Sequence, residues 1–268
     1  MSQLWADLRR LNRAERAWLV GFSLLVLAAT CYFSATGTDW NSAYSIVLNW
    51  LVSPISAISG VFCVVLVAKG LISNWVWGLL SCACYGLVAW TSGYYGDWLL
   101  NWFYFVPSQF FVWWCWKNQL HSETQLVRMR ELGTHWLWLT PLVLLSIGLT
   151  GWFLTQVDGF VSSALARNSM IYQQLQNYSG FALAGPMLDA STVVFQIAAQ
   201  LLMIRFFAAQ WTFWLLTNLL NILAWSVVLL TTADSAPYAV PTLLMWIAFF
   251  INSVYGAINW SRGAAQHK

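Results

Sequence analysis

Amide, hydroxyl and aromatic side chains recur at helical spacing inside four otherwise apolar stretches of the chain. They are Asn101, Tyr104, Ser108 and Gln109; Asp189, Thr192, Gln196 and Gln200; Trp211, Trp214, Asn218, Asn221 and Trp225; and Asn252, Tyr255 and Asn259. Residues three or four positions apart share one face of an α-helix. A polar side chain in an apolar helix is costly unless it faces a partner or a water-filled cavity. The pattern therefore predicts a polar pocket enclosed by several helices.

Such a pocket would bind its ligand by hydrogen bonds and ring stacking rather than by charge. Amides offer both donors and acceptors, which suits a ligand with hydroxyl or amide groups, and aromatic faces suit a flat ring, above all a cationic one. Phosphates generally require Arg, Lys or a helix N-terminus, and the basic residues of the four stretches, Lys117 and Arg205, lie at their ends rather than among these polar positions. The alternative for each single amide is a hydrogen bond between helices without any ligand.

The candidate binding residues fall into two chemical groups. We expect hydrogen bonds to the ligand from Asn101, Gln109, Gln196, Gln200 and Asn218, and stacking from Trp75, Trp113, Trp211, Trp214 and Tyr255. Asp189 is the one acid well within these stretches, and it lies three residues after Pro186 in the expected first turn of a helix. A carboxylate there interacts favourably with the helix dipole, so a helix-stabilising role and a ligand role both stay open.

The remaining polar residues indicate no catalytic, metal or nucleic-acid site. His121, His135 and His267 lie in expected loops or at a terminus, and Cys82 and Cys84 are two residues apart, so they would point to different faces of a helix. A nucleic-acid binder would need a basic stripe. We therefore expect no enzyme activity, cofactor or metal. An intramembrane enzyme would need a buried nucleophile or metal set, and a structural or sensory membrane protein is the other alternative.

Composition identifies the solvent around these stretches as a lipid bilayer. Of the 268 residues, 60% are hydrophobic and 8% are charged, whereas a soluble domain carries about 25% charged residues. A helix needs about 20 mostly apolar residues to cross the hydrocarbon core. Stretches of that length occur at about 16–36, 44–68, 73–92, 96–118, 135–157, 186–207, 211–231 and 238–260. The sequence therefore predicts an all-α integral membrane protein with about eight transmembrane helices.

Basic residues predict the orientation, because cytoplasmic loops carry an excess of Lys and Arg. With the N-terminus in the cytoplasm, eleven of the twelve basic residues fall on the cytoplasmic side. They are Arg9, Arg10, Arg13, Arg16, Lys69, Lys117, Arg128, Arg130, Arg205, Arg262 and Lys268. Arg167 alone falls outside. Both termini are therefore predicted to be cytoplasmic.

The chain also contains an internal repeat. Lys69 precedes Trp75 by six residues, and the same pair of residue types recurs 136 positions later as Arg205 and Trp211. We interpret residues 44–118 and 186–260 as two three-helix units. Residues 119–185 would supply a cytoplasmic loop, a linking span and an outer loop, while 1–43 would add an extra helix and 261–268 a cytoplasmic tail. A single linking span leaves the two units parallel, with a pseudo-axis along the membrane normal.

Several short motifs carry a resemblance to a known family. They are NWVWG at 74–78, YGD at 95–97, NWFYFVPSQFFVWWCW at 101–116, LDAST at 188–192, QWTFWLLTN at 210–218 and INSVYG at 251–256. With these motifs the chain resembles the PnuC-type nicotinamide riboside transporters over about residues 44–262. One departure is Val112, where the family often has glycine.

The resemblance implies more than the residues alone indicate. It implies a three-plus-one-plus-three order of spans, like two fused SWEET-type bundles, and facilitated diffusion of nicotinamide riboside across the inner membrane. It also implies trapping by a cytoplasmic kinase and a trimeric assembly. Relatives of this fold carry thiamine or riboflavin, so another ring-containing vitamin is the alternative substrate.

Overall fold

Every regular element in the part of the chain that the structure describes is a helix. The computed structural model describes residues 2–119 and 130–265. Its elements are α1 (Ser2–Arg9), α2 (Arg13–Gly37), α3 (Ala43–Val47), η1 (Leu48–Val52), α4 (Ser53–Ala68), α5 (Asn74–Ser92), α6 (Tyr95–Leu99), η2 (Leu100–Phe105), α7 (Val106–Gln119), η3 (Gly133–His135), α8 (Trp136–Leu165), α9 (Met170–Ser179), α10 (Ala184–Ile204), α11 (Gln210–Thr231), η4 (Ala233–Ser235) and α12 (Ala236–Ala265). Outside the described residues lie His121, Arg128, His267 and Lys268.

Six helical runs among the described residues are long and apolar enough to cross a membrane. They are Arg13–Gly37, Ala43–Ala68, Gly133–Leu165, Ala184–Ile204, Gln210–Thr231 and Ala236–Arg262, and each overlaps a predicted span. The other two predicted spans are helical, as α5 and as the run α6–η2–α7, but they are not among the six. Both runs contain several Trp and Tyr side chains, and α6–η2–α7 also contains several amides, all of which are less apolar than Leu, Ile or Val.

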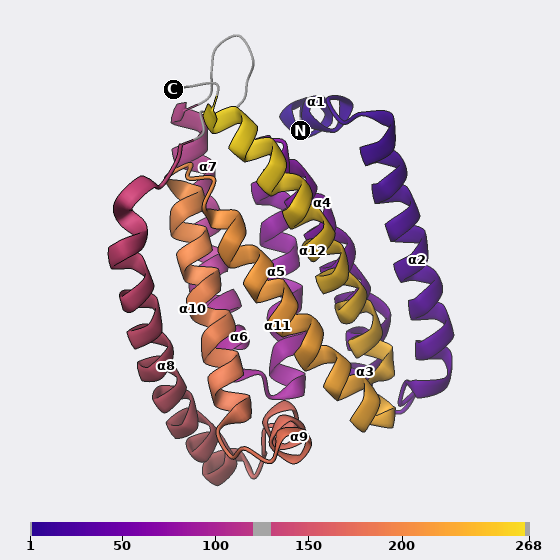
Figure 1. Cartoon of the computed structure of the whole chain (residues 1–268). Helices are drawn as coiled ribbons and strands as arrows, with labels where there is room; N and C mark the ends of the chain where they lie inside the picture. The colour runs from indigo at the N-terminus through magenta and orange to yellow at the C-terminus, as the bar shows by residue number, and fades with distance from the viewer. Residues whose placement is uncertain (1, 120–129, 266–268) are drawn as a thin grey trace.

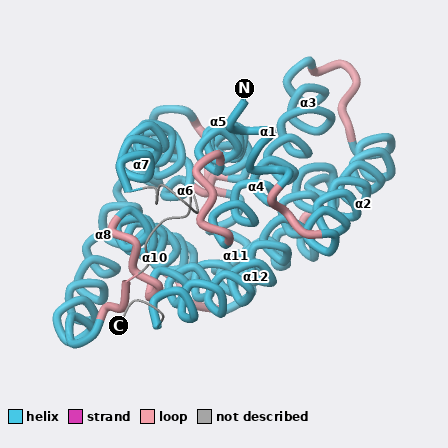
Figure 2. Tube along the Cα trace, turned by 90° about the horizontal axis from the view of Figure 1, so that it is seen from above, coloured by secondary structure: helices cyan, strands magenta, loops and turns pink. Residues whose placement is uncertain are grey.

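The long helices stand side by side in one bundle (Figure 1). Seen along their long axes, α2 and α8 lie at opposite edges (Figure 2), and the apolar windows of these two helices are the least buried of the six. In the middle, α4 packs against α5 and α12, while α10 packs against α11 and α8. The edge helices therefore leave apolar side chains such as Leu24 and Trp138 on the outer surface, which suits a lipid solvent.

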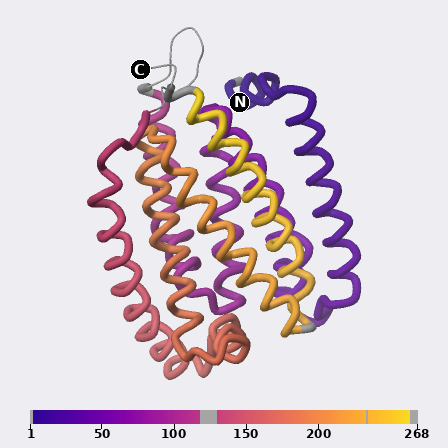
Figure 3. The backbone as a smooth tube through the Cα atoms, in the orientation of Figure 1, coloured from indigo at the N-terminus to yellow at the C-terminus, as the bar shows by residue number. Residues whose placement is uncertain are grey.

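The described N- and C-terminal ends lie at the same end of the bundle (Figure 3). The turn between α4 and α5 lies there too, because the Ser73 amide donates to Asp7 in α1. The turn between α10 and α11 pairs with the segment after α7 through the bridge between Arg130 and Phe207. Arg167 instead lies in the connection between α8 and α9, and α9 is at the other end of the bundle (Figure 1).

The repeat in the sequence corresponds to a repeat of backbone hydrogen bonds in the α4–α5 and α10–α11 turns. The Gly70 amide donates to Val67 and the Leu71 amide to Leu66, and 136 residues later the Phe206 amide donates to Met203 and the Phe207 amide to Leu202. The amides of Asn74, Trp75 and Val76 likewise match those of Gln210, Trp211 and Thr212. Gly70 has φ +67° and Phe206 has φ +64°. The two turns therefore share one backbone conformation.

Two π-helical turns, η1 and η2, interrupt the helices that carry Asn49 and Asn101. Each is followed within two residues by a proline, Pro54 after η1 and Pro107 after η2. Proline has no N–H and its ring crowds the carbonyl four residues earlier, so the local ladder shifts to a wider turn. Each proline is therefore preceded by a local distortion of its helix.

Gly70→Ala should destabilise the protein by about 1–2 kcal/mol, because an L-residue pays that cost in the left-handed conformation. The matched control is Gly21→Ala in α2, where an added Cβ meets nothing within 4 Å and alanine is the better helix former by about 1 kcal/mol. Thermal unfolding in detergent measures both. Equal melting temperatures for the two variants would contradict the assignment of a strained turn.

Candidate functional site

A cavity of ≈ 100 Å³ lies between α4, α5 and η2–α7 on one side and α10, α11 and α12 on the other. Its walls are apolar, aromatic and amide side chains. They comprise Gly60, Cys63, Val64, Val67, Asn74, Gly78, Ser81, Cys82, Tyr85, Asn101, Phe105, Gln109, Gln196, Gln200, Met203, Trp211, Trp214, Asn218, Met245, Trp246, Phe249 and Ser253. By the measure in which one water needs about 10–15 Å³, the cavity has room for several waters.

Seven of the ten predicted binding residues line this cavity. They are Asn101, Gln109, Gln196, Gln200, Trp211, Trp214 and Asn218. They come from η2, α7, α10 and α11, so residues that share a helix face in the sequence line the same cavity. The walls contain no Lys, Arg, His, Asp or Glu among the described residues.

Gln109 is the amide with most freedom in the cavity. Its side chain is buried, yet no hydrogen bond joins it to another residue in 2–119 or 130–265. Gly78 makes room for it, because a Cβ on Gly78 would lie 2.7 Å from the Gln109 Oε1 atom. Glycine at position 78 thus allows the close approach of the amide to α5, and Gln109 can offer a ligand either its oxygen or its nitrogen.

Trp211 and Trp214 form the aromatic part of the wall on α11. Trp211 lies against Gly256, where any added side chain would overlap its ring, and its ring centroid is 6.1 Å from that of Trp260. The Trp214 indole donates to the Gln210 Oε1 atom over 3.3 Å, and its ring lies 6.4 Å from Phe105. These contacts hold both indoles in place, which is what stacking on a flat ligand requires.

Trp75, Trp113 and Tyr255 do not line the cavity. Trp75 and Trp113 face each other with ring centroids 6.0 Å apart, and the Lys117 ammonium lies 5.0 Å from the Trp113 ring. Trp113 is 37% exposed. The stacking role of Trp75 and Trp113 therefore stays a prediction that the cavity does not support. The spacing in the sequence identified a helix face but not which way that face points.

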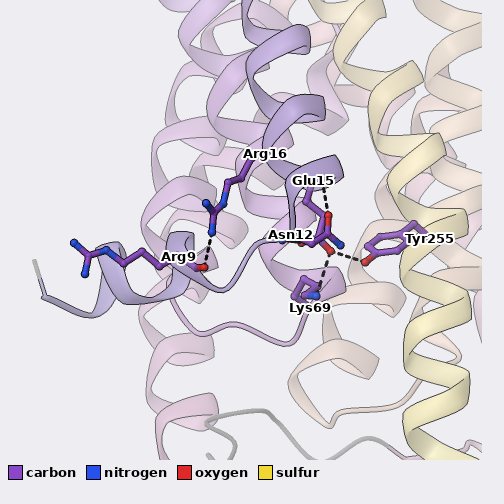
Figure 4. Close-up of polar contacts among 6 residues, drawn as sticks. All are labelled: Arg9, Asn12, Glu15, Arg16, Lys69 and Tyr255. Carbon is purple, nitrogen blue, oxygen red and sulfur yellow. Dashed lines mark hydrogen bonds and ion pairs between the residues drawn. The ribbon is translucent and has the colours of Figure 1, made fainter.

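Tyr255 instead belongs to a polar cluster that holds the start of α2 (Figure 4). Its hydroxyl donates to the Glu15 Oε1 atom over 2.6 Å, and the Lys69 Nζ atom lies 3.2 Å from the same oxygen. Asn12 caps α2. Its side-chain oxygen accepts from the Glu15 backbone amide, and its backbone amide donates to the Glu15 carboxylate. Glu15 therefore joins α2 both to the turn after α4 and to α12.

The buried acids next to the cavity were only partly predicted. Asp97 was not among the predicted binding residues, but the structure buries it completely in α6. It accepts from the Tyr85 hydroxyl at 2.7 Å and from the Gln196 amide nitrogen at 2.6 Å, and both of these donors line the cavity. The motif YGD marked the position in the sequence, but nothing in the motif showed that the short helix turns inward.

Asp189 stabilises a helix end, but the helix is not its own. Its carboxylate accepts from the backbone amides of Gly96 at 2.7 Å and Asp97 at 3.1 Å, at the start of α6. It also accepts from the Tyr172 hydroxyl of α9 at 2.6 Å. A carboxylate at a helix N-terminus satisfies amides that have no partner within the helix. Asp189 thus links α10, α6 and α9.

Asp189→Ala should lower the free energy of unfolding by at least about 3 kcal/mol, because each buried donor left without a partner costs about 1–3 kcal/mol. The control is Asp234→Ala, since Asp234 is exposed and surface changes usually stay within about 0.5 kcal/mol. Thermal unfolding in detergent distinguishes the two. An Asp189→Ala protein as stable as the control would show that these bonds do not hold α6.

A bundle of apolar helices around a cavity lined by apolar, aromatic and amide side chains, without charged groups among the described residues, is the architecture of a membrane transporter for a small solute. A family model described as nicotinamide mononucleotide transporter matches residues 49–262. The nicotinamide riboside transporter PnuC of Neisseria mucosa is 33% identical over 223 residues, which cover 82% of this chain and 74% of that protein. The chain belongs to the nicotinamide mononucleotide transporter family.

Two further comparisons agree with this membership. The nicotinamide riboside transporter PnuC of Haemophilus influenzae is 32% identical over 215 residues, which cover 80% of each protein. The solved structure described as the vitamin B3 transporter PnuC is 28% identical, with a TM-score of 0.69, and the match covers 96% of this chain and 94% of that one. The likeness therefore extends over nearly the whole chain.

Proposed function

We propose that this chain carries nicotinamide riboside across the inner membrane by facilitated diffusion. The supporting observation is the cavity, whose amides and aromatic rings match a carboxamide, a ribose and a flat cationic pyridinium. Three relatives, from Neisseria mucosa, Haemophilus influenzae and Escherichia coli, are named nicotinamide riboside transporters. A cytoplasmic kinase that phosphorylates the riboside would make net uptake continue.

The riboside fits the cavity better than the phosphorylated mononucleotide does. No wall residue in the described part of the chain is basic, so a phosphate would lose its hydration without gaining a charged partner. Moving an ion out of water without such a partner is very unfavourable. The chemistry of the walls therefore favours the uncharged ribose end of a riboside.

The proposed membrane arrangement follows from the basic residues and the repeated turns. We infer eight crossings, with α5 and α6–η2–α7 completing the six most apolar ones, and two parallel three-helix units joined by α8. Both termini would be cytoplasmic, which puts the Lys69 and Arg205 turns on that side and Arg167 outside. Rocking of the two units about the cavity would expose it alternately, and three copies would form the working assembly.

Uptake of radiolabelled riboside into proteoliposomes tests the transport mechanism. We expect uptake without a proton or sodium gradient, because no acid in the described part of the chain lines the cavity and could carry a coupled ion. Strict dependence on either gradient would contradict facilitated diffusion. A competition panel of riboside, thiamine and riboflavin tests the substrate, and stronger competition by either of the latter two would favour that vitamin.

Gln196→Ala and Asn218→Ala should each weaken riboside binding by about tenfold or more, because each removes a buried hydrogen-bonding group worth about 1–3 kcal/mol. Calorimetry with purified protein measures the dissociation constant. The control is Trp114→Ala, because Trp114 is 55% exposed and does not line the cavity. Unchanged affinity in both amide variants would show that the riboside binds elsewhere.

A further inference from the structure

The amides of the cavity share an orientation that determines which ligand the cavity accepts. Asn74 and Asn101 donate their side-chain nitrogens to the backbone carbonyls of Leu71 and Asp97, over 2.7 and 2.8 Å. A carbonyl only accepts hydrogen bonds, so neither amide can be reversed. Their side-chain oxygens accept no hydrogen bond within 2–119 or 130–265, and both residues line the cavity.

Gln200 is fixed in the same sense. Its side-chain nitrogen donates to the Ser108 hydroxyl oxygen over 3.3 Å. The Ser108 hydroxyl donates its proton to the Phe105 carbonyl over 3.0 Å. Toward Gln200 it can therefore act only as an acceptor. Asn218 donates to the Ser253 hydroxyl over 2.9 Å, and its oxygen is buried without a partner among the described residues.

Gln196 is fixed by Asp97, which does not itself line the cavity. The Asp97 carboxylate accepts the Gln196 side-chain nitrogen on one oxygen and the Tyr85 hydroxyl on the other. The Trp225 indole donates to the Tyr85 oxygen over 3.4 Å, which leaves the Tyr85 proton for Asp97. The Gln196 oxygen therefore faces away from Asp97, and it accepts no hydrogen bond from another residue in the described part of the chain.

We infer that the amides of the cavity form a set of hydrogen-bond acceptors, and that Asp97 is a positioning residue that makes Gln196 one of them. Asn74, Asn101, Gln196, Gln200 and Asn218 all hold their nitrogens on the protein and leave their oxygens for a ligand. Among the wall residues that the structure describes, Gln109 is the amide that can still supply a donor, and Trp211 and Trp246 have buried indole N–H groups without a partner. This inference rests on the proposed function and deepens it.

Such a cavity selects a ligand that is rich in donors and carries no negative charge. Ribose hydroxyls and a carboxamide NH₂ group supply donors, and the free Gln109 amide can donate to the carboxamide oxygen. An analogue with a carboxylate in place of the carboxamide has the same shape but only acceptors at that end. Its oxygens would meet further acceptors, and buried groups without partners produce strong discrimination.

Calorimetry with the riboside and with its carboxylate analogue tests the inference on the unmodified protein. We expect the riboside to bind at least about 100-fold more tightly than the analogue. Comparable affinities for the two ligands would overturn the inference. Failure of the riboside itself to bind would instead overturn the proposed function, so the two failures are distinguishable.

Asp97→Asn tests the positioning role. The Tyr85 hydroxyl still donates to the oxygen of the new amide side chain, so that oxygen stays next to Tyr85. The new side-chain nitrogen then faces Gln196, and the Gln196 amide must reverse so that its oxygen accepts from that nitrogen. Gln196 then presents a donor to the cavity. We expect the affinity ratio of riboside to carboxylate analogue to fall by about tenfold or more.

If Asp97 had a purely structural role, Asp97→Asn would weaken the binding of both ligands equally and leave the ratio of their affinities unchanged. That result would overturn the assignment. Asp158→Asn is the matched control, because it makes the same chemical change in α8 away from the cavity walls, and its ratio should not move. Thermal unfolding of each variant checks folding. The wild-type comparison of the two ligands needs no substitution, so it decides the inference on the cavity even if Asp97→Asn does not fold.

Discussion

A buried polar group in a bilayer protein is costly without a partner, and Asp97 and Asp189 each supply such a partner between α6 and α10. Asp189 in α10 accepts the first amides of α6, and Asp97 in α6 accepts the side chain of Gln196 in α10. Each acid thus bonds to the helix that carries the other. Neither carboxyl group could stay buried in an apolar interior without such bonds, so this pair holds α6 against α10 next to Gln196, which lines the cavity.

The same constraint explains why the cavity amides other than Gln109 also make a hydrogen bond of the kind that stabilises helices and helix pairs. Asn101 bonds to its own helix through its nitrogen, and Asn218 bonds to Ser253 in α12. In each case half of the amide stabilises the protein and the other half stays available. A side chain can therefore hold helices together and bind a ligand, and the two interpretations of a polar residue within a span are not exclusive.

The sequence predicted the helical class, the approximate bounds of the long helices and the repeated turn, because these depend on composition and on local spacing. It also predicted seven of the residues around the cavity, since helical periodicity identifies a shared face. It did not predict that Asp97 is buried in a short helix or that Tyr255 donates to Glu15. It also did not predict that Trp75 and Trp113 lie outside the cavity. Those depend on helix rotation and on contacts between residues far apart in the chain, which no local pattern encodes.

The most direct test of the account is a structure of the protein with nicotinamide riboside bound. We expect the ligand in the cavity between α4, α5 and α7 on one side and α10, α11 and α12 on the other, with its ring against Trp211 or Trp214. We also expect ribose hydroxyls or the carboxamide NH₂ group to donate to the oxygens of Gln196 and Asn101. A riboside bound outside this cavity, or a cavity in which those oxygens bond only to protein, would contradict the account.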